Sequence, residues 1–574
     1  MSYSEIRVMK LFRTTLILIL LILLIGAVFL WFNRPDKVDL ATYAPADSLL
    51  YVELNSPSEV ARAIQNSDVW KAAAPITKSN TGSGNKLAAA AAEAGLGPID
   101  AVLFARAQIA LVVVGLNTTQ ENDVLRVKPE VALVAETHTA RWRTKPAVLA
   151  AVKHLAGFAY GASNCSERTA DAEYVECSVA GGERKILAAI DDTLVVVGNT
   201  ENAVRSCLEA RRGTRPSILT DPELVRVRSS LASDKPLAFG YISAGNSAKL
   251  FSWAAPLWMG RAPGDEPFQQ LLTVSATKIL RGVAWTAVST GRGIEDRYLF
   301  SLEPDVVSRL QPAFETAERD ENFWKLVPGS FQSLTIYRSK EPDVAWRSLD
   351  SAVALKLDAL PAVLFGALLK SSLSTYGIGN PKEALATLTP PLLTLKPSSA
   401  AEGSVLVARV SDEARLKRSL VQDFFKSANG QIVEGIQADL DPELEFSAVF
   451  ADGYVLLGRT ENMQSCLVAL RRSQAIQDAK LKQSTHDSSA PILTVANDEL
   501  RLTNFISTLL MLQGRQLSAE QIAGLQDSLR DYTFSSTETR LSSAGIERKT
   551  RSAFGQFSTF TSLLRSDSSG VVGR

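Results

Sequence analysis

The chain of 574 residues has few side chains arranged for metal binding or nucleophilic catalysis. Its three histidines, His138, His154 and His486, are widely separated, and no two have the four-residue spacing of a zinc-binding pair on one helix. The stretch Ser484–Asp487 places Ser, His and Asp in one polar loop, whereas the members of a catalytic triad come from separate elements. We therefore predict neither a zinc site nor a Ser-His-Asp site, and no cofactor.

One spacing matches a known nucleophile motif. Ser83 and Lys86 have the Ser-x-x-Lys spacing of penicillin-binding serine enzymes, but the companion Ser-Asp-Asn and Lys-Thr-Gly motifs are absent and Ser83 lies in a Gly-rich connector. A Walker loop and a dinucleotide-binding fingerprint are also missing from the sequence. Hydrolysis by two carboxylates stays open as an alternative, because two acidic residues from distant positions suffice for glycoside chemistry.

Two acidic positions could suggest acid–base carboxylates, namely Asp191-Asp192 and Asp452-Gly453. Each lies between two strand-like runs, where Asp and Gly favour the tight turns of β-hairpins. We therefore predict that both positions are turns. No catalytic residue is assigned from the sequence.

The four cysteines divide into two kinds. Cys165 and Cys177 flank a polar stretch in a region predicted to be exported, where disulfides persist, so we expect them to form a disulfide. Cys207 and Cys466 lie on equivalent apolar helix faces and are expected to be buried as small hydrophobic residues.

The elements that carry these residues occur twice. Gly198-Asn-Thr-Glu-Asn202 and Gly458-Arg-Thr-Glu-Asn462 each follow an aliphatic run and continue through a cysteine to an Arg-Arg pair. Thr200 and Thr460 are natural helix N-caps, and the Glu and Arg residues suit the two ends of a helix. A repeat separated by roughly 260 residues indicates an internal duplication.

The order of predicted elements defines the fold class. Short strands cluster as hairpins and alternate with amphipathic helices, which favours an α+β fold of mainly antiparallel sheet packed with helices. We expect two duplicated lobes of one topology, residues 45–305 and 327–556, joined by a connector at 306–326. Residues 557–574 are expected to be a tail that is disordered at its end.

An apolar segment precedes these lobes. Residues 14–33 carry no charge and include ten consecutive Leu or Ile residues, and about 20 apolar residues suffice to cross a bilayer core of about 30 Å. Basic residues outnumber acidic ones before the segment, so residues 1–13 are predicted to be cytoplasmic and the bulk of the chain extracytoplasmic. Residues 34–44 are the expected linker. Cleavage of the segment as a signal peptide stays open, although its apolar run is long and lacks a good cleavage site.

Charge excludes one class of partner. Lys+Arg and Asp+Glu both total 61, and no long basic stretch is present. Binding to nucleic acid rests on neutralising phosphates, so we predict no nucleic-acid partner.

The chain resembles a known bacterial family. Four features carry the resemblance: the anchor, the short linker, the start Pro45-Ala-Asp-Ser-Leu-Leu-Tyr-Val52 and the element Asp192-Thr-Leu-Val-Val-Val-Gly-Asn-Thr-Glu-Asn202. They are similar to features of the proteins grouped as domain of unknown function 3352. The resemblance covers about Ala44 to Gly555, although the second repeat departs from the opening pattern at Gly329-Ser-Phe331. It implies a bacterial, single-pass protein of the inner membrane whose bulk is extracytoplasmic, and it supplies no catalytic residues.

Three function classes follow. The first is a non-enzymatic scaffold or interaction module for another envelope component. The second is a carrier or sensor of apolar ligands or lipids, suggested by the apolar stretches Leu250–Met259 and Ala359–Leu369, which core packing would also explain. The third is a hydrolase with a carboxylate-based site. A deep apolar pocket would favour the carrier, and a cleft with clustered carboxylates would favour the enzyme.

Overall fold

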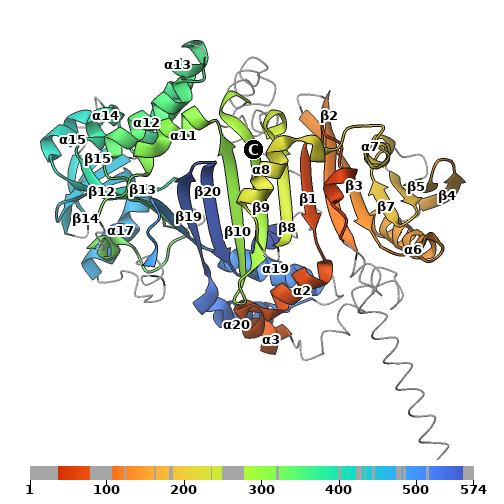
Figure 1. The fold of residues 1–574 in the computed structure, drawn as a ribbon. Coiled ribbons are helices and arrows are strands. Elements are labelled where there is room, and N and C mark those ends of the chain that lie inside the picture. Colours follow the sequence, from red (N-terminus) through yellow and green to blue (C-terminus); the bar gives the residue numbers. More distant parts are fainter. Residues whose placement is uncertain are drawn as a thin grey trace, which may run out of the picture.

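One antiparallel β-sheet of 20 strands, with helices on both faces, forms the described part of the chain in the computed structural model (Figure 1). The structure describes residues 37–77, 107–121, 124–160, 163–179, 185–233, 236–247, 277–318, 322–357, 359–397, 403–421, 429–433, 435–441, 446–472, 481, 487–511 and 516–559. The predicted α+β class with a mainly antiparallel sheet is confirmed.

The strands fall into two halves. In order across the sheet, the N-terminal half contains β4 (Ser163–Thr169), β5 (Glu173–Val179), β6 (Lys185–Asp191), β7 (Leu194–Gly198), β3 (Val124–Glu136), β2 (Gln108–Glu121), β1 (Leu50–Leu54), β8 (Pro236–Ser243), β9 (Leu280–Ser289) and β10 (Ile294–Leu302).

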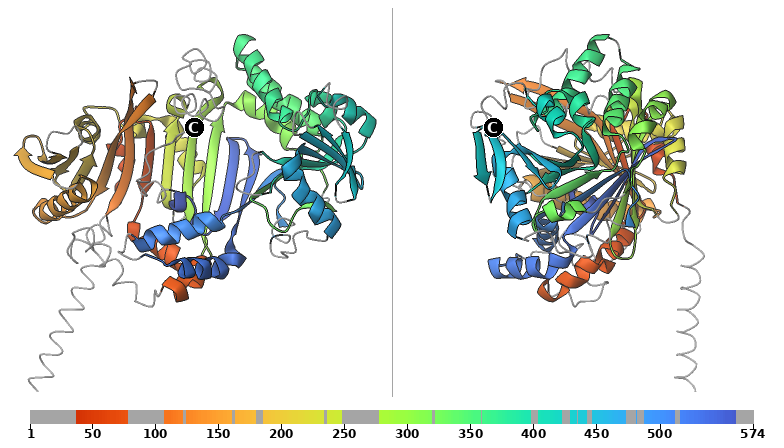
Figure 2. Two further views of the ribbon diagram at one scale, coloured as in Figure 1. Left: turned by 180° about the vertical axis from the view of Figure 1, so that it is seen from behind. Right: turned by 90° about the vertical axis from the view of Figure 1, so that its left-hand side faces the viewer.

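The C-terminal half continues from β10. In order, it contains β20 (Gly545–Ser552), β19 (Phe534–Ser542), β18 (Ile492–Asn497), β11 (Ser333–Tyr337), β12 (Leu388–Lys396), β13 (Val405–Val410), β17 (Tyr454–Arg459), β16 (Phe446–Ala451), β15 (Ile436–Asp441) and β14 (Asn429–Val433). Each strand of the first half thus has a counterpart in the second half whose number is ten higher and whose neighbours are the equivalent strands. The sheet twists progressively from one half to the other (Figure 2).

The seam between the halves is the antiparallel pair β10–β20. Ile294 lies opposite Ser552, and Ile546, which follows Gly545 as Ile294 follows Gly293, lies opposite Phe300. The pairing is therefore self-complementary, as at the interface of a two-fold dimer.

Two glycines allow the strands of the seam to approach. A Cβ atom at Gly293 would collide with the carbonyl oxygen of Ser552, and one at Gly545 would collide with that of Phe300. Only glycine lacks a Cβ, so both positions fit the close backbone contact.

An ion-pair cluster also spans the seam. Glu295, which is buried, lies 2.8 Å from Arg297, 3.0 Å from Lys549 and 3.1 Å from Arg551. Burial opposes ionisation of Glu295, but these three cations lower its pKa below the usual value. The carboxylate therefore ties its own strand to β20.

The described helices lie in the connections between these strands. They are α2 (Pro57–Asn66), α3 (Asp68–Thr77), α6 (Arg141–Tyr160), α7 (Glu201–Arg211), α8 (Pro222–Ser230), α11 (Pro304–Leu310), α12 (Pro342–Ala354), α13 (Ala359–Ser374), α14 (Pro381–Leu385), α15 (Glu413–Ser419), α17 (Thr460–Arg472), α19 (Glu499–Met511) and α20 (Ala519–Leu529). Short 3-10 turns are η1 (Leu40–Tyr43), η2 (Ile218–Thr220), η3 (Gln311–Phe314), η4 (Asn322–Leu326) and η5 (Arg530–Tyr532).

The repeated Thr-Glu-Asn motif opens a helix in both halves. The Thr200 hydroxyl accepts a hydrogen bond from the backbone N–H of Ala203 and caps α7, as expected. Thr460 begins α17, and its hydroxyl lies 2.6 Å from that of Ser447.

Each face of the sheet has its own core. In the N-terminal half, α7, α8 and η1 cover one face, while α2 and α6 cover the other. In the C-terminal half, α17 and η4 cover one face, while α12, α14 and α15 pack on the opposite one. Helix α3 crosses to the other half and packs on α19 and α20 through Trp70, Phe505 and Leu525 (Figure 1).

Parts of the expected linker, connector and tail contribute to the fold. Part of the expected linker is η1, whose Leu40 and Ala41 are buried in the N-terminal core. The expected connector, 306–326, contains η3, η4 and all of α11 except its first two residues. At the start of the expected tail, Phe557 is buried against Trp285. Apolar residues in these short segments find core positions that the sequence pattern does not reveal.

The predicted membrane segment, residues 14–33, lies outside the described residues. Among the helices that the structure does describe, none is long and apolar enough to cross a membrane.

Candidate ligand-binding pocket

The histidines are not brought together. The His138 ring Nε2 lies 3.1 Å from Gln108 Oε1, and His154 is exposed on α6. His486, Ser83 and Lys86 lie outside the described residues. Within the described ranges, no group of three His, Cys, Asp or Glu side chains could hold a metal ion.

The two acidic positions are hairpin turns. Asp192, Asp452 and Gly453 have positive φ angles of 59°, 53° and 77° between paired strands β6–β7 and β16–β17. These are the left-handed conformations that Asp and Gly tolerate in tight hairpins, so the turn prediction is confirmed.

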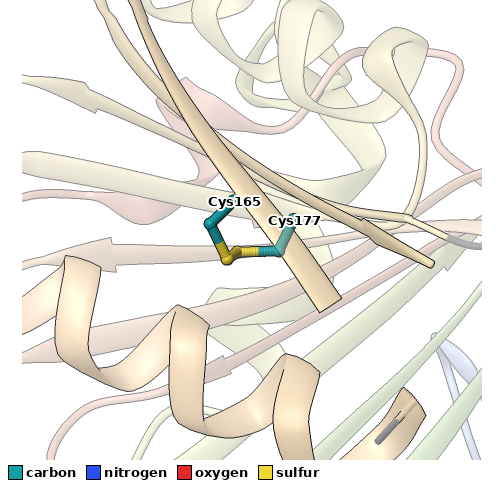
Figure 3. Close-up of a disulfide and its surroundings, with 2 residues drawn as sticks. All are labelled: Cys165 and Cys177. Atoms are coloured by element: carbon teal, nitrogen blue, oxygen red, sulfur yellow. A yellow bond between two sulfur atoms is a disulfide. The ribbon is translucent and has the colours of Figure 1, made fainter. Parts of the chain in front are cut away.

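Cys165 and Cys177 are bonded to each other in a disulfide (Figure 3). They face one another on β4 and β5, and their Cα atoms are 4.1 Å apart. Cys177 packs in a core with Val148 and Val152 of α6. The disulfide therefore fixes the outermost hairpin of the N-terminal half.

Cys207 and Cys466 are free thiols buried in equivalent helices, as expected. Burial raises the pKa of each thiol to about 12. Thiolate, not thiol, is the reactive form, so neither residue is a candidate nucleophile.

One buried carboxylate titrates near neutrality. Burial raises the pKa of Asp296 on β10 to about 6, although Trp285 Nε1 donates to it at 2.8 Å and the Gln556 backbone N–H at 3.1 Å. The bond from Gln556 holds the chain that follows β20 against β10, and the bond from Trp285 links β10 to its neighbour β9. The role that the contacts support is structural.

A pocket with a volume of about 410 Å³ lies between the C-terminal half of the sheet and helices α12 and α13. Its described lining comes from both helices, from strands β11, β12, β13 and β18, and from η3: Ala313, Phe314, Tyr337, Ser339, Pro342, Ala345, Trp346, Leu349, Leu369, Ser372, Leu373, Tyr376, Leu385, Leu392, Thr394, Leu406 and Ile492.

Strand alternation places the floor of the pocket. On β11, Leu334 and Ile336 point into the closed core beneath α17, so Tyr337 faces the opposite side of the sheet. Tyr337 is paired with Leu392 on one side and Ile492 on the other, and all three line the pocket. The roof begins at α12, where Pro342 occupies the first turn and starts the helix.

The described lining is uncharged, and its polar side-chain groups are hydroxyls and the indole N–H of Trp346. The Tyr376 hydroxyl lies 2.6 Å from Ser404 Oγ, and Ser339 Oγ donates to the Ala313 carbonyl oxygen at 2.8 Å. Burial raises the pKa of Tyr376, so its hydroxyl stays protonated. Such a lining suits an apolar molecule and disfavours an ion, because a charge buried without a partner is costly.

A second hollow, of about 610 Å³, shares Phe314 with this pocket. It lies between α11 and the β19–β20 turn and includes Glu315, Gln311, Ser308, Ser542 and Ser543. Its volume is larger, but its lining is more polar than that of the first pocket and offers less apolar surface to a ligand. We therefore take the smaller, apolar pocket as the candidate site.

The pocket residues were only partly visible in the sequence. The stretch Ala359–Leu369 contributes α13, which includes the lining residue Leu369. The floor residues of β11, β12 and β18 carry no motif, and their convergence depends on strand pairing. Leu250–Met259, the other apolar stretch, lies outside the described residues.

Comparison of the chain with known protein families, with curated proteins and with solved structures gave no match.

Proposed function

We propose that the chain is a membrane-anchored, extracytoplasmic protein that binds an apolar ligand in the pocket beneath α12 and α13. The observation that carries this proposal is the uncharged pocket of about 410 Å³. Ligand sites typically have volumes of about 300–1,000 Å³ and are lined mainly by apolar and aromatic side chains. Trp346, Phe314 and several leucines supply that lining.

The ligand class follows from the lining. Removing apolar surface from water contributes roughly 25 cal/mol per Å² against the entropic cost of binding, so an alkyl chain or apolar ring would gain most. The hydroxyls of Tyr337 and Thr394 could bond a carbonyl or hydroxyl group on the ligand. The described lining contains no carboxylate, so this pocket does not support the hydrolase alternative.

The anchor in this proposal is residues 14–33, supported by the uncharged run of Leu and Ile and the preceding basic residues. Reporter fusions after Asp36 and at the C-terminus should both behave as exported. A cytoplasmic result for either fusion would contradict the anchor. A scaffold role for another envelope component remains a prediction from the sequence.

We also propose that the two halves arose by duplication of one unit. The repeated motifs at Gly198 and Gly458, together with the identical strand order, support this origin. The self-complementary seam is what a two-fold dimer would leave after fusion of its genes.

The ligand proposal is tested by photolabelling the full chain in lipid nanodiscs. The probe is an uncharged 16-carbon fatty alcohol with a diazirine in its alkyl chain. We expect saturable labelling of peptides from α12, α13 and β12, which unlabelled fatty alcohol should suppress. Labelling that is not saturable, or that falls on other peptides, would contradict the proposal.

A matched pair of variants locates the site. Ala345 lines the pocket and is 9% exposed, so Ala345→Phe should fill the cavity and weaken labelling about ten-fold, equivalent to about 1.4 kcal/mol. Ala354→Phe places the same side chain on an exposed position of the same helix and should leave labelling unchanged.

A further inference from the structure

Helix α6 presents an exposed aromatic and basic face at one end of the sheet. Trp142 is 77% exposed, and Arg143, Lys153 and His154 are also exposed. Trp142 and Lys153 are eleven residues apart, which is three helical turns, so they lie on the same side about 16 Å apart along the axis. The opposite side of the helix, with Val148 and Val152, packs on β5 and β6.

The charge of this face is unbalanced. Helix α6 contains no acidic residue. Arg141 forms an ion pair with Glu173, and Lys145 lies 3.4 Å from Glu167 and 3.2 Å from Glu173, so these two cations hold the helix on the β4–β5 hairpin. Arg143 and Lys153 form no ion pair with any described residue, and both side chains are exposed to solvent.

The start of the described chain is fixed at the same end of the molecule. The Val38 backbone N–H donates to Gln108 Oε1 at 2.9 Å, and Gln108 Nε2 donates to the Val38 carbonyl at 3.0 Å. Gln108 also contacts His138, three residues before α6 begins. From Asn33 to Val38 five residues can reach at most about 17 Å, so the body must stay close to any bilayer that holds residues 14–33.

We propose that the exposed face of α6, with Trp142, Arg143 and Lys153, docks on the anionic headgroup layer of the membrane that carries the anchor. This inference rests on the anchor in the proposed function. Tryptophan favours the interface between water and hydrocarbon, and lysine and arginine close to an anionic surface are attracted to its phosphates.

The experiment measures the depth of position 142 in nanodiscs that contain the full chain. In Trp142→Cys a thiol-reactive fluorophore reports contact with lipids that carry a nitroxide on the headgroup. The native cysteines do not interfere, because Cys165 and Cys177 are disulfide-bonded and Cys207 and Cys466 are buried. Ile432→Cys is the control, because Ile432 is 80% exposed on β14 at the other end of the sheet.

We expect strong quenching at position 142 and little at position 432 in nanodiscs with anionic phospholipid. In nanodiscs of zwitterionic lipid alone, quenching at position 142 should fall. Arg143→Gln and Lys153→Gln should each lower the ratio of docked to undocked protein about five-fold, because each cation near an anionic surface contributes a similar attraction. Lys382→Gln, an exposed cation on α14, should have no effect.

Equal quenching at positions 142 and 432 in anionic nanodiscs would overturn the proposal. Protection of position 142 that does not depend on anionic lipid or on the two cations would overturn it too, and would indicate a protein partner on this face. Co-elution of the chain with nanodiscs tests the anchor separately, and photolabelling tests the pocket, so failure of docking is distinguishable from failure of the proposed function.

Discussion

The two halves of the sheet share one pairing pattern but use the same face differently. In the N-terminal half, Leu54 is paired with Ile109 and Ala238, and Val60 and Ala63 of α2 pack directly on this face. In the C-terminal half, the counterpart of Leu54 is Tyr337, above which α12 and α13 leave the pocket. In both halves the strand pairing sets where helices pack on this face of the sheet. The volume of the side chains between helix and sheet then decides whether that space is filled or remains a pocket.

One row of paired residues shows the difference in side chains. Across five strands of the C-terminal half, threonines lie opposite one another in register: Thr394, Thr335, Thr494, Thr537 and Thr550. The corresponding row of the N-terminal half is Leu111, Val52, Gly240, Trp285 and Tyr298. Large apolar side chains fill a core, whereas threonines occupy less volume and carry hydroxyl groups, and Thr394 of this row lines the pocket.

The largest effect should come from removing the Cys165–Cys177 disulfide, which has no counterpart in the C-terminal half. Replacing Cys165 and Cys177 with Ala opens a loop of sequence separation 12, which should destabilise the β4–β5 hairpin by about 3 kcal/mol. Hydrogen exchange should accelerate in β4 and β5 but not in the undisulfided counterpart β14–β15. Equal protection of β4 and β5 in the wild type and the variant would refute this role.

The seam should respond next. Gly293→Ala and Gly545→Ala each force a methyl group against backbone carbonyl oxygen across the β10–β20 pair, and should each destabilise the protein by about 2 kcal/mol. Gly157→Ala is the control, because Gly157 has open space in α6, and alanine there should stabilise by up to about 1 kcal/mol. Denaturant unfolding measures all three. If the seam variants were as stable as the wild type, the two halves would not depend on this contact.

A pH effect should distinguish equivalent positions of the two halves. The folded pKa of Asp296, about 6, is above the ordinary aspartate value of 3.8, so the folded protein binds this proton more tightly than the unfolded chain. Stability from this group is therefore present at low pH and lost as pH rises through about 6. Acidification from about pH 7.5 to about pH 5 should add about 1.4 kcal/mol, which Asp296→Asn should remove.

The matched control for this titration is Asp192→Asn, in an exposed turn with a positive φ that Asn also tolerates. Thermal unfolding at the two pH values provides the measurement. The counterpart of Asp296 on β20 is Arg548, which cannot titrate in this range. An unchanged pH dependence in Asp296→Asn would show that other groups dominate.

The smallest effect should come from removing the N-cap of α7, the helix that begins at the repeated Thr-Glu-Asn motif. Thr200→Ala removes the hydroxyl that accepts from the Ala203 N–H and should cost about 1 kcal/mol, whereas Thr200→Ser should keep the cap. Chemical denaturation resolves this difference. Equal losses in both variants would mean that the methyl group of Thr200, not its hydroxyl, stabilises α7.

The sequence allowed local structure to be predicted better than long-range contacts. Asp192 and the pair Asp452-Gly453 carry turn chemistry in their own residue types, and Thr200 carries capping chemistry, so each could be assigned without knowing its neighbours. Strand β10 begins at Ile294 and strand β20 at Gly545. That these strands pair with each other was not predictable, because alternation identifies a strand but not the strand beside it.

The pocket was harder still. It arises from the distance between α12, α13 and four strands that are far apart in sequence, and no single residue such as Tyr337 or Ala345 signals it. The burial of Leu40 and Phe557 has the same cause, since short apolar stretches can belong to a linker or to a core. Such features depend on the summed volumes of many side chains.

The uninterrupted hydrogen bonding from β4 to β14 has a mechanical consequence. Neighbouring strands are about 4.8 Å apart, so the 20 strands form a twisted beam up to about 90 Å long with no flexible joint between its halves. A load at the β4 end passes through every strand pair to the β14 end. The number of strands therefore sets the distance between the β4 end and the β14 end of the sheet.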